Sequence, residues 1–348
     1  MPGMKSFYEC TRAEITSLLD RPRRAAEVYT SVYRDWTDGF QKVEALPARC
    51  RTTLSDQLSL GLPAIEREFE SADGTCRYLL RLEDGQLAES VFIPRPERFT
   101  ICISSQVGCA LACSFCLTGQ LGLIRNLTPG EIVSQVVLLQ RLHDFRDAPR
   151  QFSVVLMGMG EPLHNYDSVL KAIRILHDDH GLKIPMTRIT LSTAGLVPEI
   201  ERLGAEPMFP NLSVSLTGAT NPVRDVLMPI NRKYPIEQLI AAIRALPASR
   251  QKRVMFEYVV IKDVTDALDD ARSLARWLSG MCAKVNLIPL NPAKEIAFER
   301  PDDGQILQFQ EVLLKEGVTT FIRKNRGGDV YGACGQLKQA VGIRSRHE

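Results

Sequence analysis

The chain has 348 residues and a net charge of +2, which suits one large α/β domain with an accessory or two ordinary domains and excludes a small disulfide-stapled fold. No apolar run approaches the roughly 20 residues that span a bilayer, and the first residues lack the apolar run of a signal peptide. We therefore expect a cytoplasmic protein without a membrane partner. In that reducing compartment, clustered cysteines indicate metal binding or catalysis rather than structural disulfides.

The N-terminal part of the sequence is predicted to be helical. Apolar residues recur at helical spacing over 21–36, and a second helix is expected over 45–60. After residue 75 the apolar period changes to two, and the runs on either side of "EDGQ" predict a hairpin. We assign residues 1–75 to a helical accessory domain and 76–98 to a β-hairpin extension.

From residue 99 onward, strand-like runs alternate with amphipathic helices. The strands are expected at 99–105, 152–158, 188–193, 211–216, 254–261 and 284–289. The helices are expected at 128–143, 166–179, 197–204, 235–247, 265–279 and 303–316. Six such units predict an α/β fold with a parallel sheet closed or half-closed into a partial (β/α)6 barrel over 99–348, which binds ligands at the C-terminal ends of its strands.

A cluster of thiols follows the first of these strands. Cys109, Cys113 and Cys116 are spaced C-x3-C-x2-C, so one compact loop can direct three sulfurs at a single centre. Thiolates select zinc, copper(I) or iron–sulfur clusters, and a structural zinc site normally takes four protein ligands. Three ligands without a partner pair favour a four-iron cluster with one open iron, and a structural or redox metal loop is the alternative.

With Phe115 before the last cysteine, this pattern resembles the radical S-adenosylmethionine (SAM) superfamily. The wider context "CISSQVGCALACSFC", together with "MGMGEPLHN", "TLSTAG", "LMPINRKY", "LIPLNP" and "GACGQL", resembles the RlmN/Cfr family of RNA adenine methyltransferases over about residues 20–340. The resemblance implies one 4Fe–4S cluster held by Cys109, Cys113 and Cys116. It also implies SAM bound through its amino and carboxylate groups at the open iron, with two SAM molecules used per turnover.

The ends of the later strands supply the expected SAM contacts. In "MGMGEP", two glycines let the backbone approach a ligand, and Glu161 can accept a hydrogen bond from an ammonium group. The resemblance implies SAM contacts at Gly160, Glu161, Ser192, Ser215, Leu216, Thr217 and Asn291. Thr217 departs from the family, which usually has a histidine there, and its hydroxyl cannot titrate near neutral pH. Taken alone, these motifs are also typical of polar strand ends and an Asn-Pro turn.

Three further residues are expected to be catalytic. Cys334 has glycines on both sides in "YGACGQL", which predicts a mobile loop that could carry a thiol into a site. The resemblance implies that Cys334 is methylated and carries a methylene group, and that Cys102 forms a transient disulfide with it. It also assigns to Glu89 the removal of the ring proton. The other cysteines are interpreted as buried small hydrophobes: Cys10, Cys50, Cys76 and Cys282.

Short basic runs could supply phosphate contacts to RNA if they converge on one mouth. They are Arg21, Arg23 and Arg24; Arg250, Lys252 and Arg253; Arg323, Lys324 and Arg326; and Arg344 and Arg346. The resemblance implies an RNA-recognition role for the N-terminal accessory domain and rRNA or tRNA, or both, as substrate. It also implies a reducing electron donor such as flavodoxin or ferredoxin. We expect a monomer.

The expected activity is methylation of C2 of an adenosine by a radical SAM enzyme. The motifs "FEYVVI", "LIPLNP" and "RKNRG" favour the C2-methylating RlmN branch, whereas "TGQLGL" and "MPINRKYPI" also resemble the C8-methylating Cfr branch. Since "SLTG" and "GGDVYGACGQL" fit neither branch fully, a divergent paralogue within the family is a further hypothesis. The alternative from another class is a non-catalytic iron–sulfur RNA-binding protein, which would need none of Cys102, Cys334, Glu161 and Glu89.

Overall fold

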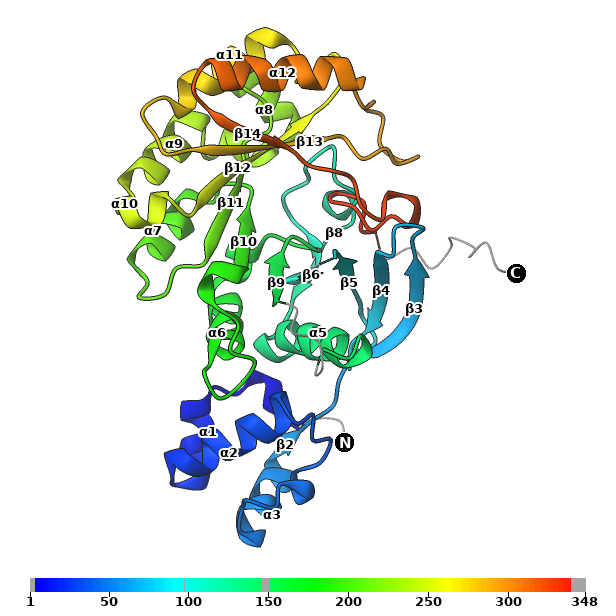
Figure 1. Cartoon of the computed structure of the whole chain (residues 1–348), viewed down its shortest axis with the longest axis vertical. Helices are drawn as coiled ribbons and strands as arrows, with labels where there is room; N and C mark the ends of the chain where they lie inside the picture. The colour runs from blue at the N-terminus through cyan, green and yellow to red at the C-terminus, as the bar shows by residue number, and fades with distance from the viewer. Residues whose placement is uncertain (1–3, 97, 146–150, 339–348) are drawn as a thin grey trace, which may run out of the picture.

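The computed structural model describes residues 4–96, 98–145 and 151–338. A ten-stranded sheet forms its centre, in the order β14-β13-β12-β11-β10-β9-β6-β5-β4-β3 (Figure 1). The larger part of the sheet is parallel and consists of β6 Arg98–Cys102, β9 Gln151–Leu156, β10 Ile189–Thr193, β11 Asn211–Ser215, β12 Val254–Val260, β13 Lys284–Pro289 and β14 Thr319–Ile322. Since β14 and β3 are its two edges, the sheet is an open, partial barrel.

Helices lie along the outer side of the parallel strands (Figure 1). They are α5 Pro129–Leu142, α6 Tyr166–His177, α7 Val197–Ala205, α8 Asn221–Leu227, α9 Ile236–Ala245, α10 Ala248–Gln251, α11 Leu268–Leu278 and α12 Asp303–Lys315. All six predicted strands and all six predicted helices are present, so the predicted α/β class and partial barrel are confirmed. Local sequence signals mark where helices begin. For example, α5 begins with a capping box between Thr128 and Glu131 and has Pro129 at its first position.

The antiparallel part of the sheet contains the predicted hairpin and one strand that the sequence did not predict. The hairpin consists of β4 Cys76–Arg81 and β5 Leu87–Pro94. The additional strand is β3 Ala64–Glu70, which pairs with β4 inside the region predicted to be helical. The description of the whole of 1–75 as helical was therefore wrong. Most residues of β3 are exposed, because an edge strand tolerates charged side chains that hide the alternation typical of a strand.

The N-terminal helices form a unit below the sheet in Figure 1. Its elements are β1 Lys5–Ser6, η1 Phe7–Glu9, α1 Arg12–Leu19, α2 Pro22–Tyr33, η2 Phe40–Lys42, α3 Ala48–Gln57 and β2 Leu58–Ser59. Buried aromatic rings pack around Phe7, with centroid distances of 5.5 Å to Tyr29 and 5.6 Å to Phe40. Arg12 pairs with Asp178 after α6, with a nitrogen–oxygen distance of 2.9 Å. This ion pair helps to join the unit to the barrel.

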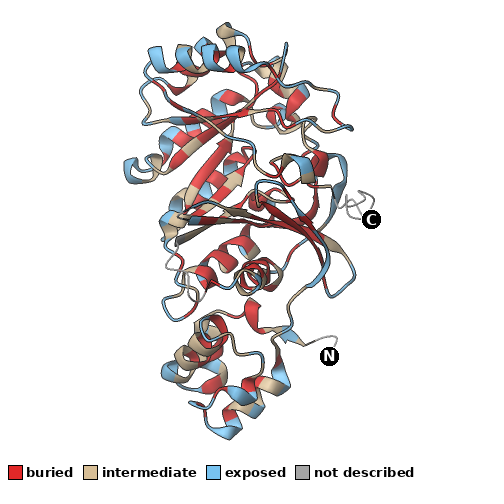
Figure 2. Ribbon diagram, turned by 45° about the vertical axis from the view of Figure 1, so that its right-hand side comes forward, coloured by how far each residue is buried: buried red, intermediate tan, exposed pale blue. Residues whose placement is uncertain are grey.

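The core follows the strands of the sheet, where Figure 2 shows almost continuous burial. Cys10, Cys50 and Cys76 are buried as predicted, whereas Cys282 is exposed, contrary to prediction. The reason is that Cys282 follows the C-terminal end of α11 in an exposed turn, where no layer covers it. Within the described ranges, no helix is long and apolar enough to cross a bilayer.

Candidate active site

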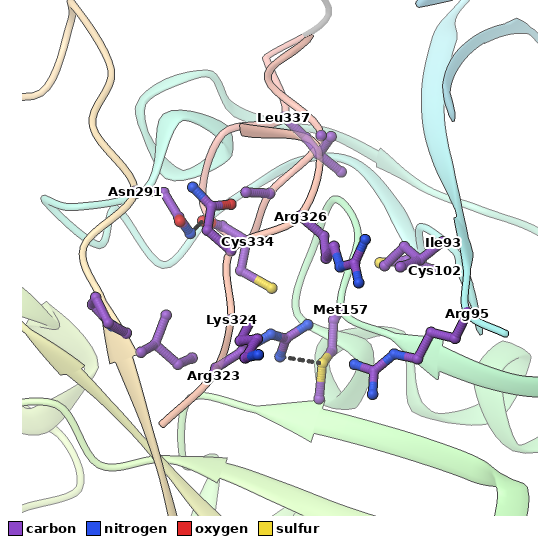
Figure 3. Close-up of a pocket in the computed structure, with 15 residues that line it drawn as sticks. Ile93, Arg95, Cys102, Met157, Asn291, Arg323, Lys324, Arg326, Cys334 and Leu337 are labelled. Carbon is purple, nitrogen blue, oxygen red and sulfur yellow. Dashed lines mark hydrogen bonds between the residues drawn. The ribbon is translucent and has the colours of Figure 1, made fainter. Parts of the chain in front are cut away.

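Two adjoining cavities open where the parallel strands end. The larger one, of about 170 Å³, is lined by the three clustered cysteines and by polar strand-end residues. The smaller one, of about 40 Å³, is lined by Cys102 and a group of basic side chains (Figure 3). Five residues line both cavities: Met157, Ile288, Asn291, Arg323 and Cys334. Cys334 therefore lies at the junction of the two cavities.

A short hairpin directs the clustered thiols into the larger cavity. Cys109 ends β7 Gln106–Cys109, which pairs with β8 Gly122–Asn126, and Cys116 precedes α4 Leu117–Gln120. Gly108 has φ +77°, and a Cβ there would lie 1.8 Å from the carbonyl oxygen of Gly122. Only glycine permits this close approach of the two strands.

The chemistry of these thiols fits a cationic cluster. Burial, with smaller contributions from the charges of Glu161 and Cys116, raises the pKa of Cys109 to about 12. Burial likewise raises the pKa of Cys113, with Cys116 and Cys109 adding to the effect. Three thiolates that line one buried cavity need positive charge, which iron–sulfur ligation supplies. In the part of the chain that the structure describes, no three His, Cys, Asp or Glu side chains could hold a single metal ion. In an iron–sulfur cluster, by contrast, each thiolate binds its own iron.

Glu161 forms part of the wall of the larger cavity. Its carboxylate accepts hydrogen bonds from the N–H groups of Ala194 (2.8 Å) and Leu163 (3.0 Å). Burial nevertheless raises the pKa of Glu161 to about 7. The preceding Gly160 has φ +104°, and a Cβ there would lie 2.6 Å from the side chain of Gln106. The site thus contains a buried carboxyl group that can ionise when an ammonium group arrives.

The remaining predicted SAM contacts divide into two groups. Ser192, Ser215 and Asn291 line the larger cavity, as do Gly160 and Glu161. Leu216 and Thr217 are fully buried and do not line it. The hydroxyl of Thr217 accepts a hydrogen bond from the N–H of Val259 (3.1 Å). Thr217, which departs from the family pattern, therefore supports β12 through this hydrogen bond and does not line the cavity.

Sequence reasoning missed a carboxylate in the same wall. Glu257 on β12 lines the larger cavity and is almost completely buried. It accepts hydrogen bonds from the hydroxyl of Ser213 and the amide of Asn286, both at 2.7 Å. The available signal was an acidic residue inside the apolar run "VMFEYVV", since strands buried on both faces are normally apolar throughout.

Cys102 and Cys334 face each other across the smaller cavity. Both side chains are seen in Figure 3 near Arg323 and Met157. Burial is the main reason that the pKa of Cys102 is raised to about 12; Cys334 contributes to the increase and Arg323 opposes it. The nearby thiol of Cys334 is the main reason that the pKa of Arg323 is raised. All nine cysteines are free, so the structure contains two neighbouring thiols and no disulfide.

The loop that carries Cys334 is anchored on both sides. Asn291 donates a hydrogen bond to the carbonyl of Cys334 (3.0 Å), and the N–H of Leu117 donates to the carbonyl of Gly335 (2.7 Å). Thr118 donates from its hydroxyl to the carbonyl of Leu337 (2.7 Å). These contacts join the loop to β13 on one side and to the cysteine hairpin on the other.

Glu89 lies apart from both cavities. It is on β5, completely buried, and forms a salt bridge with Arg77 on β4. Its second oxygen accepts a hydrogen bond from the N–H of Lys338 (3.1 Å). The structure thus brings together two of the three predicted catalytic groups and covers the third with the residues that follow Cys334.

Comparisons with known proteins agree with this geometry. Residues 103–278 match the radical SAM superfamily. The dual-specificity RNA methyltransferase RlmN of Nitratiruptor sp. is 40% identical over 97% of this chain and 98% of that protein. The protein of the same name from Syntrophotalea carbinolica is 46% identical over 90% of this chain and 83% of that protein. A radical SAM methyltransferase from Sphaerobacter thermophilus has a crystal structure that superposes with a TM-score of 0.90, at 42% identity over 97% of this chain and all of that one.

These similarities extend over nearly the whole chain, including both cavities and the Cys334 loop. The residues that line the larger cavity agree with the cofactors of such proteins, a 4Fe–4S cluster and SAM. The chain belongs to the radical SAM superfamily and, within it, to the RlmN family.

Proposed function

We propose that this protein is an RNA methyltransferase that transfers a methyl-derived carbon to C2 of an adenosine through Cys334. The observation that carries this proposal is that Cys334 lines both cavities, one with the cluster cysteines and one with Cys102. A carrier thiol between two sites can receive a group on one side and deliver it on the other. Its full-length relatives are named dual-specificity RNA methyltransferases.

The larger cavity would hold the cofactors. Cys109, Cys113 and Cys116 would hold the 4Fe–4S cluster, which with SAM supplies the methyl group and one-electron chemistry. The ionised Glu161 would accept hydrogen bonds from the ammonium group of SAM, with Gly160 leaving room for it. Further SAM contacts would come from Ser192, Ser215 and Asn291. Leu216 and Thr217 would contribute through the backbone at the end of β11.

The smaller cavity would hold the adenine. C2 is an amidine carbon and therefore electrophilic, so it cannot attack the methyl group of SAM directly, and a carrier residue removes this obstacle. The Cys102 thiolate would attack the sulfur of Cys334, with which it shares this cavity. A transient disulfide would form as the bond from that sulfur to the product carbon breaks, and the carbon would take up a proton. Glu89 would accept the ring proton.

Positive charge around the smaller cavity suits an RNA substrate. Arg95, Arg323, Lys324 and Arg326 line it. Burial lowers the pKa of Arg95, and the nearby Arg98, Arg326 and Arg323 lower it further. A group of repelling cations of this kind is stabilised when a phosphate binds.

The other predicted basic runs have different surroundings. Arg250 and Arg253 donate hydrogen bonds to main-chain carbonyls, including those of Leu203 and Phe209, so these two side chains stabilise the fold. Arg23 pairs with Glu27 on the accessible face of α2, and Arg344 and Arg346 lie outside the described residues.

Three further assignments belong to the same proposal. The N-terminal unit, expected over 1–75, would help to recognise RNA, beside the hairpin extension at 76–98 and the catalytic domain at 99–348. Its helices end at Gln57, before β3 joins the sheet. An electron donor such as flavodoxin or ferredoxin would reduce the cluster. The protein would be a monomer in the cytoplasm.

Digestion of treated RNA tests the proposal. The reconstituted protein is incubated with rRNA and tRNA that lack the modification, and the nucleosides are separated against synthetic 2-methyladenosine and 8-methyladenosine. We expect 2-methyladenosine. Exclusive 8-methyladenosine would contradict the C2 assignment and leave the carrier mechanism intact. The absence of both products would favour the non-catalytic RNA-binding alternative.

A further inference from the structure

A buried ion pair lies on the same face of the sheet as Cys102. Arg77 is opposite Val91 on the neighbouring strand, and Val91 is in turn opposite Cys102. Glu89 precedes Val91 by two residues, so its side chain points to the same face. Arg77 and Glu89 are both completely shielded from solvent and form a salt bridge through Nη1 and Oε1. The proposed proton acceptor is therefore tied to a cation beside the thiol site.

The segment that carries Cys334 covers this pair. The N–H of Lys338 donates to the Oε2 atom of Glu89 (3.1 Å). One residue earlier, Leu337 packs with Val91, Cys102 and Met159 in a small apolar cluster. Lys338 follows Cys334 by only four residues, so a movement of the carrier thiol would also displace the contact between Lys338 and Glu89.

The buried ion pair contributes little to the stability of the fold. Two apolar side chains of similar volume would be at least as stabilising as a buried pair of charges. Within the described ranges, Nε and Nη2 of Arg77 have no hydrogen-bond partner, and unpaired buried donors lower stability. The guanidinium lies only 3.9 Å from the ring centroid of Phe69, which offsets part of that cost. The retained charges therefore point to a role in the reaction.

We propose that Arg77 is a positioning residue that keeps Glu89 ionised and withdrawn, and that residues 334–338 form a cover that must lift before Glu89 can accept a proton. This inference rests on the proposed function, in which Glu89 is the proton acceptor. On this face of the sheet, β4 carries Arg77 and also Arg81, which pairs with Glu66, and β6 carries Cys102 and Arg98. The covering segment adds Cys334 and Lys338. Lys338 directs its ammonium group to Glu295, whereas Arg77 forms a salt bridge with Glu89. Contact with a cation favours the ionised carboxylate.

The first test examines the cover in protein without RNA. Lys338→Pro removes the N–H that bonds Glu89, whereas the matched control Lys338→Ala keeps it and removes only the ammonium group. We measure the rate at which iodoacetamide alkylates Cys334, by mass spectrometry of its peptide. We expect alkylation to become several-fold faster in Lys338→Pro and to stay close to the wild-type rate in Lys338→Ala. Equal rates in the two variants would overturn the cover.

The second test examines the positioning role in the reconstituted enzyme. Arg77→Met removes the charge, and Arg77→Lys retains it. We expect Arg77→Met to shift the pH profile of 2-methyladenosine formation upward by about one unit or more, with RNA still linked to Cys334 at the lower pH values. Arg77→Lys should restore the wild-type profile, and Glu89→Gln should be impaired at every pH.

The outcomes separate this inference from the proposed function. An unshifted profile in Arg77→Met, or uniform loss of activity that Arg77→Lys does not restore, would overturn the positioning role. If wild-type protein forms no methylated adenosine, the proposed function fails, while the alkylation rates still decide whether the cover exists.

Discussion

Asn291 donates its side-chain amide to the carbonyl oxygen of Cys334 at 3.0 Å. Asn291 follows β13 at the rim of the parallel strands and lines both cavities. One side chain therefore joins the proposed SAM site to the loop that carries the reactive thiol. A ligand that contacts Asn291 in the larger cavity would therefore also affect the position of Cys334.

The first prediction concerns this contact. Asn291→Ala should loosen the Cys334 loop, because one hydrogen bond worth about 1 kcal/mol is lost. We expect alkylation of Cys334 to become about fivefold faster, measured on the alkylated peptide by mass spectrometry. Asn286→Ala is the control, because its amide bonds Glu257 on the next strand. Identical rates in the two variants would show that Asn291 does not restrain the loop.

The second prediction concerns the cluster. Replacement of Cys109, Cys113 or Cys116 by alanine should leave protein that retains little iron after anaerobic reconstitution, since only three ligands hold the cluster. The wild-type protein should bind about four irons, and its reduced EPR spectrum should change when SAM is added. Cys282→Ala alters an exposed cysteine and should keep both properties. Stoichiometric zinc without iron in the wild-type protein would contradict this assignment.

The fold was largely predictable because local pattern and tertiary structure agree in the barrel. Each core strand is a short apolar run, and each helix repeats its apolar residues with the helical period. The exceptions are the two edges of the sheet. β14 has four residues and β3 is mostly exposed, so pairing with a neighbour, rather than local pattern, defines both strands.

Which residues line the larger cavity was predictable where this depends on spacing along the chain, as in the cysteine loop and the glycines around Glu161. The site was not predictable where it depends on register between strands. The salt bridge between Arg77 and Glu89 arises from the alignment of β4 with β5. The cover over Glu89 comes from Lys338, which is 249 residues away in sequence.

The third prediction concerns the two thiols of the smaller cavity. Cys102→Ala should accumulate RNA covalently attached to Cys334, because the thiol that resolves the intermediate is missing. Cys334→Ala should form no adduct and no methylated adenosine. The adduct is measured by gel shift, and label from the SAM methyl group should be present in it. Full turnover by Cys102→Ala would contradict its role, and full turnover by Cys334→Ala would contradict the carrier mechanism.

The fourth prediction concerns RNA binding at the mouth of the smaller cavity. Arg95→Met and Arg326→Met should each weaken RNA binding and reduce the slope of log affinity against log salt by about 1. The reason is that each arginine lines this cavity and can contact a phosphate. Lys315→Met is the control, because Lys315 lies exposed on α12 beside Glu311. An unchanged salt slope in both arginine variants would place the phosphate contacts elsewhere.

The fifth prediction concerns Glu161 and pH. Burial raises its pKa from 4.5 to about 7, so the folded state favours the protonated form. The resulting stabilisation is fully present below about pH 4.5 and is lost as the pH rises through about 7. Glu161→Gln cannot ionise, so its stability relative to wild type should increase by up to about 3 kcal/mol over that range.

Urea unfolding of the cofactor-free protein at about pH 5 and about pH 8 measures this difference. Exposed Glu201→Gln is the control and should follow the wild type at both values. The ammonium group of SAM reverses the preference of Glu161, because a nearby positive charge favours the carboxylate. Adding SAM to the reconstituted protein at about pH 6 should therefore release up to one proton, detected by calorimetry in buffers of different ionisation enthalpy. If wild type and Glu161→Gln release the same number of protons, Glu161 is not the group that meets the ammonium of SAM.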